Sequence, residues 1–439
     1  MKENRKTLGQ LFVPICLETL LFMLTGIIDT LMLSSVSDQA VGAVGTANTY
    51  IGMFIIMFGI ISSGMMAVMT QNIGAGKPGI AYQARQLGAI FNGVLGIILG
   101  LFLFFCGDKI LTLVGIAESL KEPAQVYLQI VGGSCFLNAV IPIFSGYLRA
   151  FGFLKQPLFA TIIGNIVNLV LNAVFLFVFD MGVAGVAIAT VISRIANLII
   201  VVISAHVLVK AKEDSNRLPK RAVLGQIVRV GLPSAMETAL YNVAMTFIIS
   251  FLNQMDPDGL NVTARSYTVQ ITNFSYCIGA ALAQANAIMT GWRVGSKEYE
   301  ACDKGTKKAA IIGIILAAIL ETVFALSAEI IMPIFTNDPV MIALVQKLLF
   351  IDIALEIGRV TNLVFVNALK VSGDAVFPVI MASIFMILCG VGGTYIFGIQ
   401  LELMAVGAYI GLAMDECIRA VAMFIRWQTG IWKTKRIVQ

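Results

Sequence analysis

The chain has 439 residues, of which 58% are hydrophobic and only 13% are charged, and its formal net charge is +5. Soluble globular proteins carry about a quarter charged residues, so a water-soluble fold of this length would lack the polar surface that it needs. The composition also excludes a disordered chain, a coiled coil and a secreted disulfide scaffold. We therefore expect an integral membrane protein.

Continuous apolar runs recur along the whole chain. A run of about 20 residues is long enough to cross the bilayer as a helix, and unbroken rather than alternating hydrophobicity favours helices over a β-barrel. The first run begins near Leu8 and continues past Met32, which is too long for the apolar part of a cleavable signal peptide. Twelve membrane-spanning helices are predicted, over residues 8–34, 42–70, 88–107, 124–148, 157–179, 183–208, 225–252, 262–290, 309–331, 341–369, 376–398 and 403–426.

Lysine and arginine are distributed unevenly between the two sides of these spans. With both termini placed in the cytoplasm, 22 of them fall in inside segments, three fall in outside loops and five fall within spans. Positive charge gathers on the cytoplasmic side of membrane proteins. The sequence thus predicts a multi-pass protein of the cell membrane with both ends cytoplasmic. The net charge of +5 is explained by these cytoplasmic lysines and arginines, so we expect no nucleic-acid partner.

The two halves of the chain resemble each other at a nearly constant offset of 219 to 222 residues. An ordered series of matches at one offset indicates an internal repeat. The matches pair Pro14 and Glu18 with Pro233 and Glu237, Met69-Thr70 with Met289-Thr290, Leu148-Arg149 with Leu369-Lys370, Gly152 with Gly373, Pro157 with Pro378, and Gly185 with Gly407.

The repeat divides the predicted spans into two sets of six. Because six is even, both halves enter the membrane the same way, and an axis along the membrane normal should relate them. We predict an all-α polytopic protein of two pseudo-symmetric six-helix lobes, residues 1–209 and 223–439, joined by a charged cytoplasmic linker over 210–222. This architecture is typical of transporters.

The sequence lacks the usual signatures of catalysis. His206 is the only histidine, the seven cysteines form no CxxC motif, and no GxxxxGK[ST] phosphate-binding motif occurs. Metal-dependent hydrolysis, a Ser-His-Asp triad and an ATP motor are therefore improbable. We predict that the protein is not an enzyme and needs no cofactor.

A series of motifs follows a fixed order through both halves. It comprises Pro14-x3-Glu18 with Asp29, Gln71–Lys77, Leu148–Gly152, Gly182–Ser193, Gly231–Glu237, Arg359–Asn362, Asn367–Pro378 and Met414–Arg419. In this order and spacing the chain resembles the multidrug and toxic compound extrusion (MATE) family over nearly its whole length. It is most similar to a bacterial branch with Pro-x3-Glu in both lobes.

The resemblance implies a secondary antiporter that exports mostly cationic, amphipathic organic compounds in exchange for Na⁺ or H⁺. Its lobes would rock to give alternating access, and it would act in the bilayer as a monomer. The wider fold group also contains flippases for lipid-linked or glycan substrates, and this is the alternative. The charges within the spans lean acidic, which favours cations over anionic glycans; the residues compared are Glu18, Asp29, Glu237, Glu321, Asp352 and Glu356 against Arg194, Arg265, Arg359 and Arg419.

The resemblance further implies a cation-coupling site in the first lobe, formed by Asp29, Asn168, Asn172 and Thr190. Asn168 and Asn172 are four residues apart, so they share one helix face. Some relatives carry Asp where this chain has Asn172, and the change removes a negative charge. A carboxylate at membrane depth is costly unless it is paired, solvated or protonated. Asp29 would therefore bind Na⁺, the one metal ion expected, or a proton.

Glu18 and Glu237 occupy equivalent places, each four residues after a proline. Each could bind a cationic substrate or a coupling proton, or could be a structural partner for a nearby arginine. Tyr241, Tyr267 and Gln270 are predicted for the wall of a substrate cavity in the second lobe.

Arg359 stands where the better-described branch of the family has an acidic residue. A guanidinium inside the membrane needs an anion; Glu356 is three positions away and Glu237 is expected to approach from another span. We interpret Arg359 and Glu356 as part of a charge-balanced cluster with a structural or gating role. Asp415 and Arg419 are four residues apart, which predicts an ion pair within one helix. Glu321 and Asp352 receive no predicted role.

Overall fold

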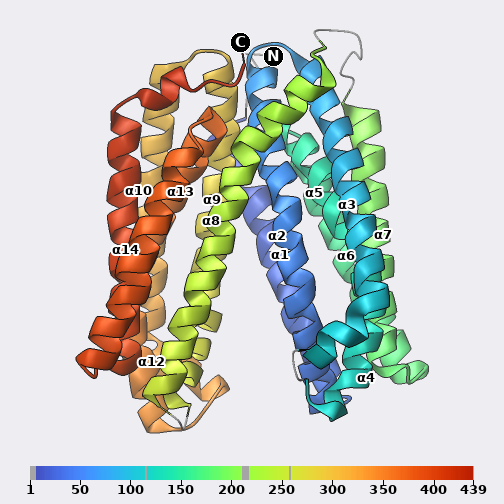
Figure 1. Cartoon of the computed structure of the whole chain (residues 1–439), viewed down its shortest axis with the longest axis vertical. Coiled ribbons are helices and arrows are strands. Elements are labelled where there is room, and N and C mark those ends of the chain that lie inside the picture. Colours follow the sequence, from blue (N-terminus) through green and yellow to red (C-terminus); the bar gives the residue numbers. More distant parts are fainter. Residues whose placement is uncertain (1–5, 114–115, 210–216, 257–258, 439) are drawn as a thin grey trace. The chain divides into compact units, whose positions relative to one another are not determined.

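The structure, a computed structural model, describes residues 6–113, 116–209, 217–256 and 259–438, and helices account for nearly all of them (Figure 1). The chain divides into two compact units, Met1–Leu232 (unit 1) and Pro233–Gln439 (unit 2). The division falls inside α8 (Lys220–Met255), directly before Pro233, where the missing backbone N–H removes a helical hydrogen bond. Residues 210–216 of the predicted linker lie outside the described residues.

Unit 1 contains six membrane-length helical segments. The first begins with a capping box, in which Thr7 and Gln10 exchange hydrogen bonds between side chain and backbone and so satisfy two free N–H groups at the helix start. The six segments are α1 (Leu8–Ser34), α2 (Asp38–Gly74), α3 (Pro78–Leu113), the bent segment of α4 (Glu118–Tyr127), η2 (Leu128–Gly132) and α5 (Cys135–Ala150), α6 (Lys155–Ala173) continued by η3 (Val174–Val178), and α7 (Gly182–Leu208).

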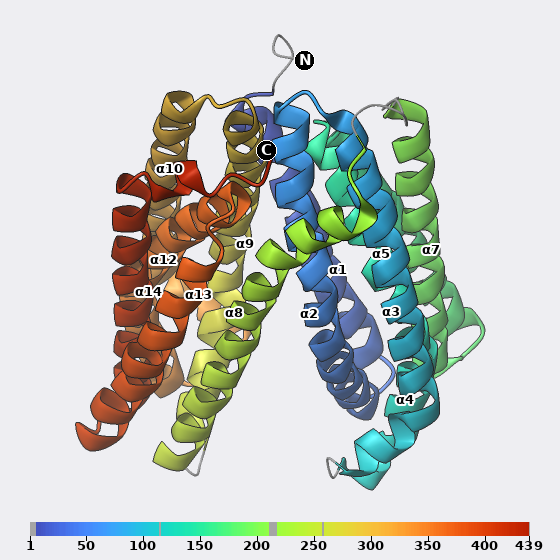
Figure 2. The ribbon, with the colours of Figure 1, turned by 45° about the horizontal axis from the view of Figure 1, so that its top comes forward.

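Unit 2 repeats this plan with six further segments, and α12 packs against α9, α10 and α14 (Figure 2). α12 begins where the Asp338 carboxylate accepts the Val340 N–H, and it ends at Gly373, whose φ of 101° suits glycine. The segments are α8, α9 (Leu260–Gly295), α10 (Tyr299–Leu326), α12 (Pro339–Ser372), α13 (Val376–Phe385) continued by η5 (Met386–Val391) and η6 (Thr394–Gln400), and α14 (Met404–Gln428). Short turns lie between or after them: α11 (Ala328–Ile331), η4 (Met332–Ile334) and η7 (Ile431–Thr434).

The predicted twelve-helix, two-lobe architecture is confirmed. Among the described residues, eight helices are long and apolar enough to cross a membrane, and the α4–α5 segment, bent by 41°, makes a ninth. The remaining three are α9, α12 and α14, which have membrane-spanning length but a more polar sequence. Polar residues in three neighbouring helices indicate that these helices line a site, since an isolated charge facing lipid would be costly.

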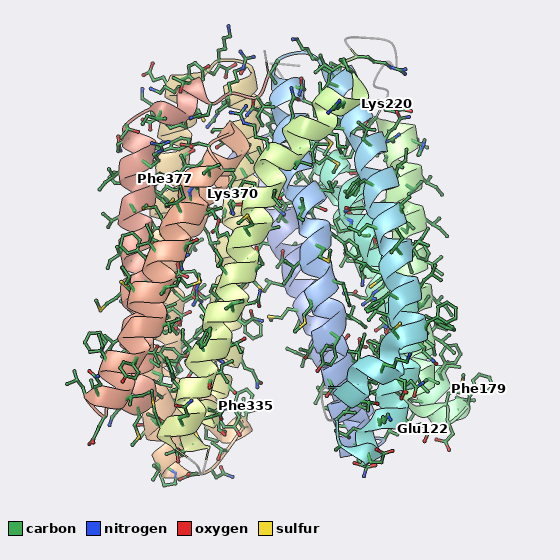
Figure 3. All side chains as sticks on the ribbon, viewed as in Figure 1. Glu122, Phe179, Lys220, Phe335, Lys370 and Phe377 are labelled. Carbon is green, nitrogen blue, oxygen red and sulfur yellow. The ribbon has the colours of Figure 1, made fainter. Side chains whose placement is uncertain are left out.

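The ends of each unit can be followed in the side-chain view. In unit 2, Phe335 and Lys370 mark opposite ends, near the beginning and the end of α12 (Figure 3). In unit 1, Glu122 and Phe179 lie at one end and Lys220 lies at the other (Figure 3). Both units therefore have helices that run from end to end, as crossing a bilayer requires.

Candidate substrate cavity and ion-coupling residues

Unit 2 contains a cavity of about 440 Å³, walled by α8, α9, α12, η5 and α14. Its size is within the range of small-molecule sites. Three tyrosines, Tyr241, Tyr276 and Tyr409, line it together with apolar residues such as Leu355 and Leu412. Aromatic faces combined with a few charged groups suit an organic ligand that has an apolar body and polar ends.

A cluster of paired charges, which we name the arginine cluster, lies at the cavity: Glu356, Arg359, Asp415, Glu416 and Arg419. Arg359, Glu416 and Arg419 line the cavity itself. Arg359 pairs with Glu356 and lies 3.6 Å from Glu416, while Arg419 contacts Asp415 at 2.6 Å and Glu416 at 2.9 Å. Each guanidinium thus has two carboxylate partners, as a charge removed from water requires.

This geometry agrees with the interpretation of Arg359 and Glu356 as a charge-balanced cluster, and with the expected pair of Asp415 and Arg419. Glu416 was not assigned by the sequence; it joins the two arginines and also accepts a hydrogen bond from the Asn362 amide at 3.0 Å. Glu237, expected near Arg359, forms an ion pair with Lys370 instead.

The internal repeat produces the same ion pair in both units. Glu18 of α1 contacts Arg149 at the end of α5 at 2.6 Å, and Glu237 of α8 contacts Lys370 at the end of α12 at 2.9 Å. We call these two contacts the repeat ion pairs. All four side chains are at most 16% exposed, and each cation lies in the last turn of its helix, where the helix dipole favours positive charge. Of the alternatives predicted for Glu18 and Glu237, this geometry favours the structural one, in which each glutamate pairs with a nearby basic side chain.

Three of the four predicted coupling residues of unit 1 are joined by hydrogen bonds. The Asn172 amide donates to the Asp29 carboxylate at 2.7 Å and to the Asn168 carbonyl at 3.3 Å, while the Asn172 Oδ1 atom is buried without a hydrogen-bond partner. Thr190, also buried, donates to the Val186 carbonyl at 2.8 Å. Asp29 is half-buried, so a small ion or a proton can reach it.

Arg194 adds a positive charge beside this group. It lies on α7 one helical turn after Thr190, close enough to Asp29 and Tyr127 to interact with them electrostatically. Its Nη1 atom is buried without a hydrogen-bond partner, and Arg194 forms no ion pair within the described part of the chain. The sequence assigned Arg194 no coupling role, because its distance from Asp29 depends on how α1 packs near α7.

Two of the residues predicted for the cavity wall lie elsewhere. Tyr241 lines the cavity, but Tyr267 packs against Phe335 with ring centroids 5.5 Å apart and Gln270 is exposed on α9. All three satisfy the sequence pattern equally well, and only the rotation of each helix decides which side chain turns inward.

Three charged residues inside unit 2 lack an ion-pair partner among the described residues. Asp352 and Arg265 both line the cavity, and the Asp352 Oδ2 and Arg265 Nε atoms have no hydrogen-bond partner. Glu321 of α10 is completely buried, and neither of its carboxylate oxygens has a hydrogen-bond partner. No group of three or more His, Cys, Asp or Glu side chains among the described residues could hold a metal ion.

Comparison with known proteins gives consistent matches along the chain. The family model MatE matches residues 14–174 and 233–396; the two segments begin 219 residues apart, which is the offset of the internal repeat. The uncharacterized transporter YisQ of Bacillus subtilis (strain 168) is 32% identical over 428 residues, covering 96% of this chain and 94% of YisQ.

More distant relatives cover as much of the chain. The probable multidrug resistance protein NorM of Thermotoga maritima is 23% identical over 99% of this chain and 95% of its own. Among solved structures, an outward-facing multidrug resistance MATE family transporter of the MOP superfamily has a TM-score of 0.87 at 21% identity, covering 97% of this chain and 96% of that chain. A MATE crystal structure in the straight conformation has a TM-score of 0.88 at 21% identity, with the same coverage.

Proposed function

This chain belongs to the multidrug and toxic compound extrusion (MatE) family, and on that premise we propose that it is a secondary antiporter that exports organic, mostly cationic compounds in exchange for Na⁺ or H⁺. The family makes it a multi-pass membrane transporter rather than an enzyme. In the proposal the lobes rock to give alternating access, and the protein acts as a monomer in the cell membrane with both termini cytoplasmic.

The observation that carries the proposal is the polar group around Asp29 in unit 1. One carboxylate faces neutral amides and has no ion-pair partner within 4 Å among the described residues, and the Asn172 Oδ1 atom beside it lacks a hydrogen-bond partner. A carboxylate so placed gains free energy from binding Na⁺ or a proton. A one-for-one exchange of two monovalent cations moves no net charge, so its energy comes from the concentration gradient of the ion. Each tenfold difference in ion concentration supplies about 1.4 kcal/mol, which can drive export against a substrate gradient of similar size.

In this mechanism the Asp29 carboxylate binds the ion in one state and accepts a hydrogen bond from the Asn172 amide in the other. When the ion is bound, the carboxylate and the amide oxygens of Asn168 and Asn172 supply its ligands, because hard cations prefer oxygen. When the ion has left, the Asn172 amide satisfies the carboxylate at 2.7 Å. Arg194 nearby favours release, since it repels a cation at the same site.

The test is uptake of a fluorescent organic cation into proteoliposomes under an imposed Na⁺ or H⁺ gradient, with wild type and Asp29→Asn compared. We expect the variant to lose gradient-driven uptake, because a neutral amide neither attracts Na⁺ as a carboxylate does nor takes up a proton. In wild type, the gradient that drives uptake identifies the coupling ion. Asp180→Asn is a matched control: Asp180 is exposed, and its φ of 50° is one that Asn accepts.

Two other outcomes would change the proposal. Uptake that persists in Asp29→Asn would move coupling to a carboxylate of unit 2. Failure of the folded wild type to move several chemically distinct cations under either gradient would contradict organic-cation antiport and favour the flippase alternative.

A further inference from the structure

The segment that follows α14 folds back over one end of unit 2. α14 ends at Gln428, and Gly430 then turns the chain with a φ of 72°, which glycine adopts without strain. From this turn the chain runs across the end of unit 2 toward the mark C (Figure 1). We name residues 430–438 the strap.

Trp432 anchors the strap. Its side chain is completely buried, and its ring stacks on the Trp427 ring with centroids 4.2 Å apart and meets the Tyr299 ring edge to face at 5.8 Å. The Trp432 indole N–H donates to the Trp427 carbonyl at 2.9 Å. The Trp427 indole N–H in turn donates to the Asp303 carboxylate of α10 at 2.8 Å. Two buried indoles with satisfied N–H groups therefore hold the strap against α10 and α14.

Beyond Trp432 the strap reaches the ends of two further helices. Arg436 donates to the carbonyl of Gly295, the last residue of α9, at 2.8 Å. The Lys435 carbonyl lies against Gly373, the residue after α12, so closely that a Cβ atom at Gly373 would overlap with it. Ile437 is 6% exposed. The strap thus joins the ends of α9, α10, α12 and α14.

The internal repeat places a similar contact in unit 1. Gln83 of α3 stands 220 residues before Asp303. Its side chain donates to the Leu218 carbonyl at 2.6 Å and accepts the Leu218 N–H at 3.2 Å. In both units a side chain near the start of the third membrane-spanning helix therefore binds near or after the end of the sixth. This shared contact indicates that the strap belongs to the architecture of the repeat.

The helices that the strap joins include three walls of the unit 2 cavity, α9, α12 and α14. Lys370, three residues before Gly373, lines the cavity and pairs with Glu237 of α8. Val366, one helical turn before Lys370, also lines the cavity and is only 4% exposed. The ends of these helices cannot separate without breaking the contacts of the strap, so the strap fixes the width of the cavity near Lys370.

We propose that the strap is a latch that keeps the Lys370 end of the unit 2 cavity closed while Trp432 is docked. When the strap is released, the ends of α9, α12 and α14 are free to separate, and a small molecule reaches Val366 from this end. Such local opening needs less free energy than unfolding of the whole unit. The inference does not depend on the proposed function, because it concerns access to the cavity whatever the ion or the substrate.

Native cysteines can report on the latch. Cys302 of α10 is completely buried next to Asp303, and Lys433 of the strap is close enough to interact with it electrostatically. Cys135 of unit 1 is also completely buried and is the internal control for damage to the whole fold. The full-length protein in lipid nanodiscs is treated with N-ethylmaleimide, and mass spectrometry of its peptides gives the reaction rate at each cysteine. The variant Val366→Cys adds a reporter inside the cavity.

Two substitutions should release the strap by different means. Trp432→Ala removes the anchoring ring, and Ile437→Asp places a charge at a buried apolar position. We expect each to raise the reaction rates at Cys302 and in Val366→Cys at least about tenfold, since truncation of a buried tryptophan shifts an equilibrium by more than this. Cys135 should react no faster. Trp432→Phe keeps a stacked ring and should have a smaller effect, and Ile431→Ala, which changes an exposed strap residue, should have none.

Faster reaction at Cys302 with an unchanged rate in Val366→Cys would overturn the proposal, because the strap would then cover α10 without closing the cavity. Unchanged rates at both positions would also overturn it. An equal rise at Cys135 in both strap variants would show that the strap maintains the whole fold and is not a latch. Since no ion gradient or substrate is used, none of these results bears on the proposed antiport.

Discussion

In unit 1 the Asp29 carboxylate accepts a hydrogen bond from a neutral amide and has one positive charge, Arg194, nearby, whereas unit 2 holds two arginines and three carboxylates in the arginine cluster beside its cavity. Both units nevertheless keep the same repeat ion pair between their first helix and the end of their fourth membrane-spanning segment. The helix arrangement and the repeat ion pairs are thus common to the two units, whereas the polar residues inside each unit differ.

This comparison shows how a duplicated fold can separate two tasks. A carboxylate that is hydrogen-bonded to an amide and has no ion pair within the described residues can exchange one small cation. The charges of the arginine cluster satisfy one another, and beside them Asp352 and Arg265 line the cavity without an ion-pair partner among the described residues. Under the proposed function, unit 1 couples to the ion, and the cavity of unit 2 is the candidate site for the substrate.

The largest effect should come from breaking the arginine cluster of unit 2. Arg419→Leu leaves Asp415 without its partner at 2.6 Å, and we expect it to lower the free energy of unfolding by about 3–5 kcal/mol. Thermal unfolding of the purified protein in detergent measures this. The double variant Asp415→Leu/Arg419→Leu should recover part of the loss, because no unpaired charge remains at Asp415. A single variant as stable as wild type would show that the pairs contribute no stability.

The repeat ion pairs should have a smaller effect, equal in the two units. Glu18→Gln with Arg149→Gln, and Glu237→Gln with Lys370→Gln, form two double-mutant cycles. We expect a coupling energy of about 1.5–3 kcal/mol in each, as for other charge-assisted hydrogen bonds that are largely buried. Unfolding midpoints of all six variants supply the values. A large coupling energy in one unit and none in the other would contradict the prediction that the repeat ion pairs stabilise both units equally.

The smallest predicted effect sharpens the difference at the coupling site. Asn172→Asp places a second carboxylate beside Asp29, where the amide now donates at 2.7 Å. We expect half-maximal uptake to need about tenfold less of the driving cation, equivalent to about 1.4 kcal/mol, because a second negative charge attracts the cation more strongly. Asn165→Asp, one turn before Asn168 and bonded to the Leu21 carbonyl, is the matched control. Unchanged ion dependence would argue against ion binding at Asp29.

The sequence predicted the polar group around Asp29 in unit 1 better than the cavity of unit 2. Asp29, Asn168 and Asn172 come together as expected, because two of the three share a helix face and the resemblance placed the third. Arg265 and Asp352 were not assigned to a site. These two residues stand out because neither has an ion-pair partner among the described residues. A sequence pattern cannot predict this, because it does not show which side chains meet.

By itself, the sequence determined the membrane class, the twelve spans and the internal repeat. These follow from properties local to each segment: a helix crosses the bilayer when about 20 consecutive residues are apolar, and a duplicated segment keeps its motifs in order. Even the pair of Asp415 and Arg419 was predictable, since both lie on one helix.

Only the tertiary structure decided which charges meet across helices. Glu237 pairs with Lys370 and not with Arg359, Tyr241 lines the cavity, and Tyr267 packs against Phe335. Such contacts join residues that are distant in the chain, and they depend on how far each helix is rotated and shifted against its neighbours. A charge inside a membrane protein is costly without a partner, water or a proton, and the packing of the helices decides which partner, if any, lies within reach.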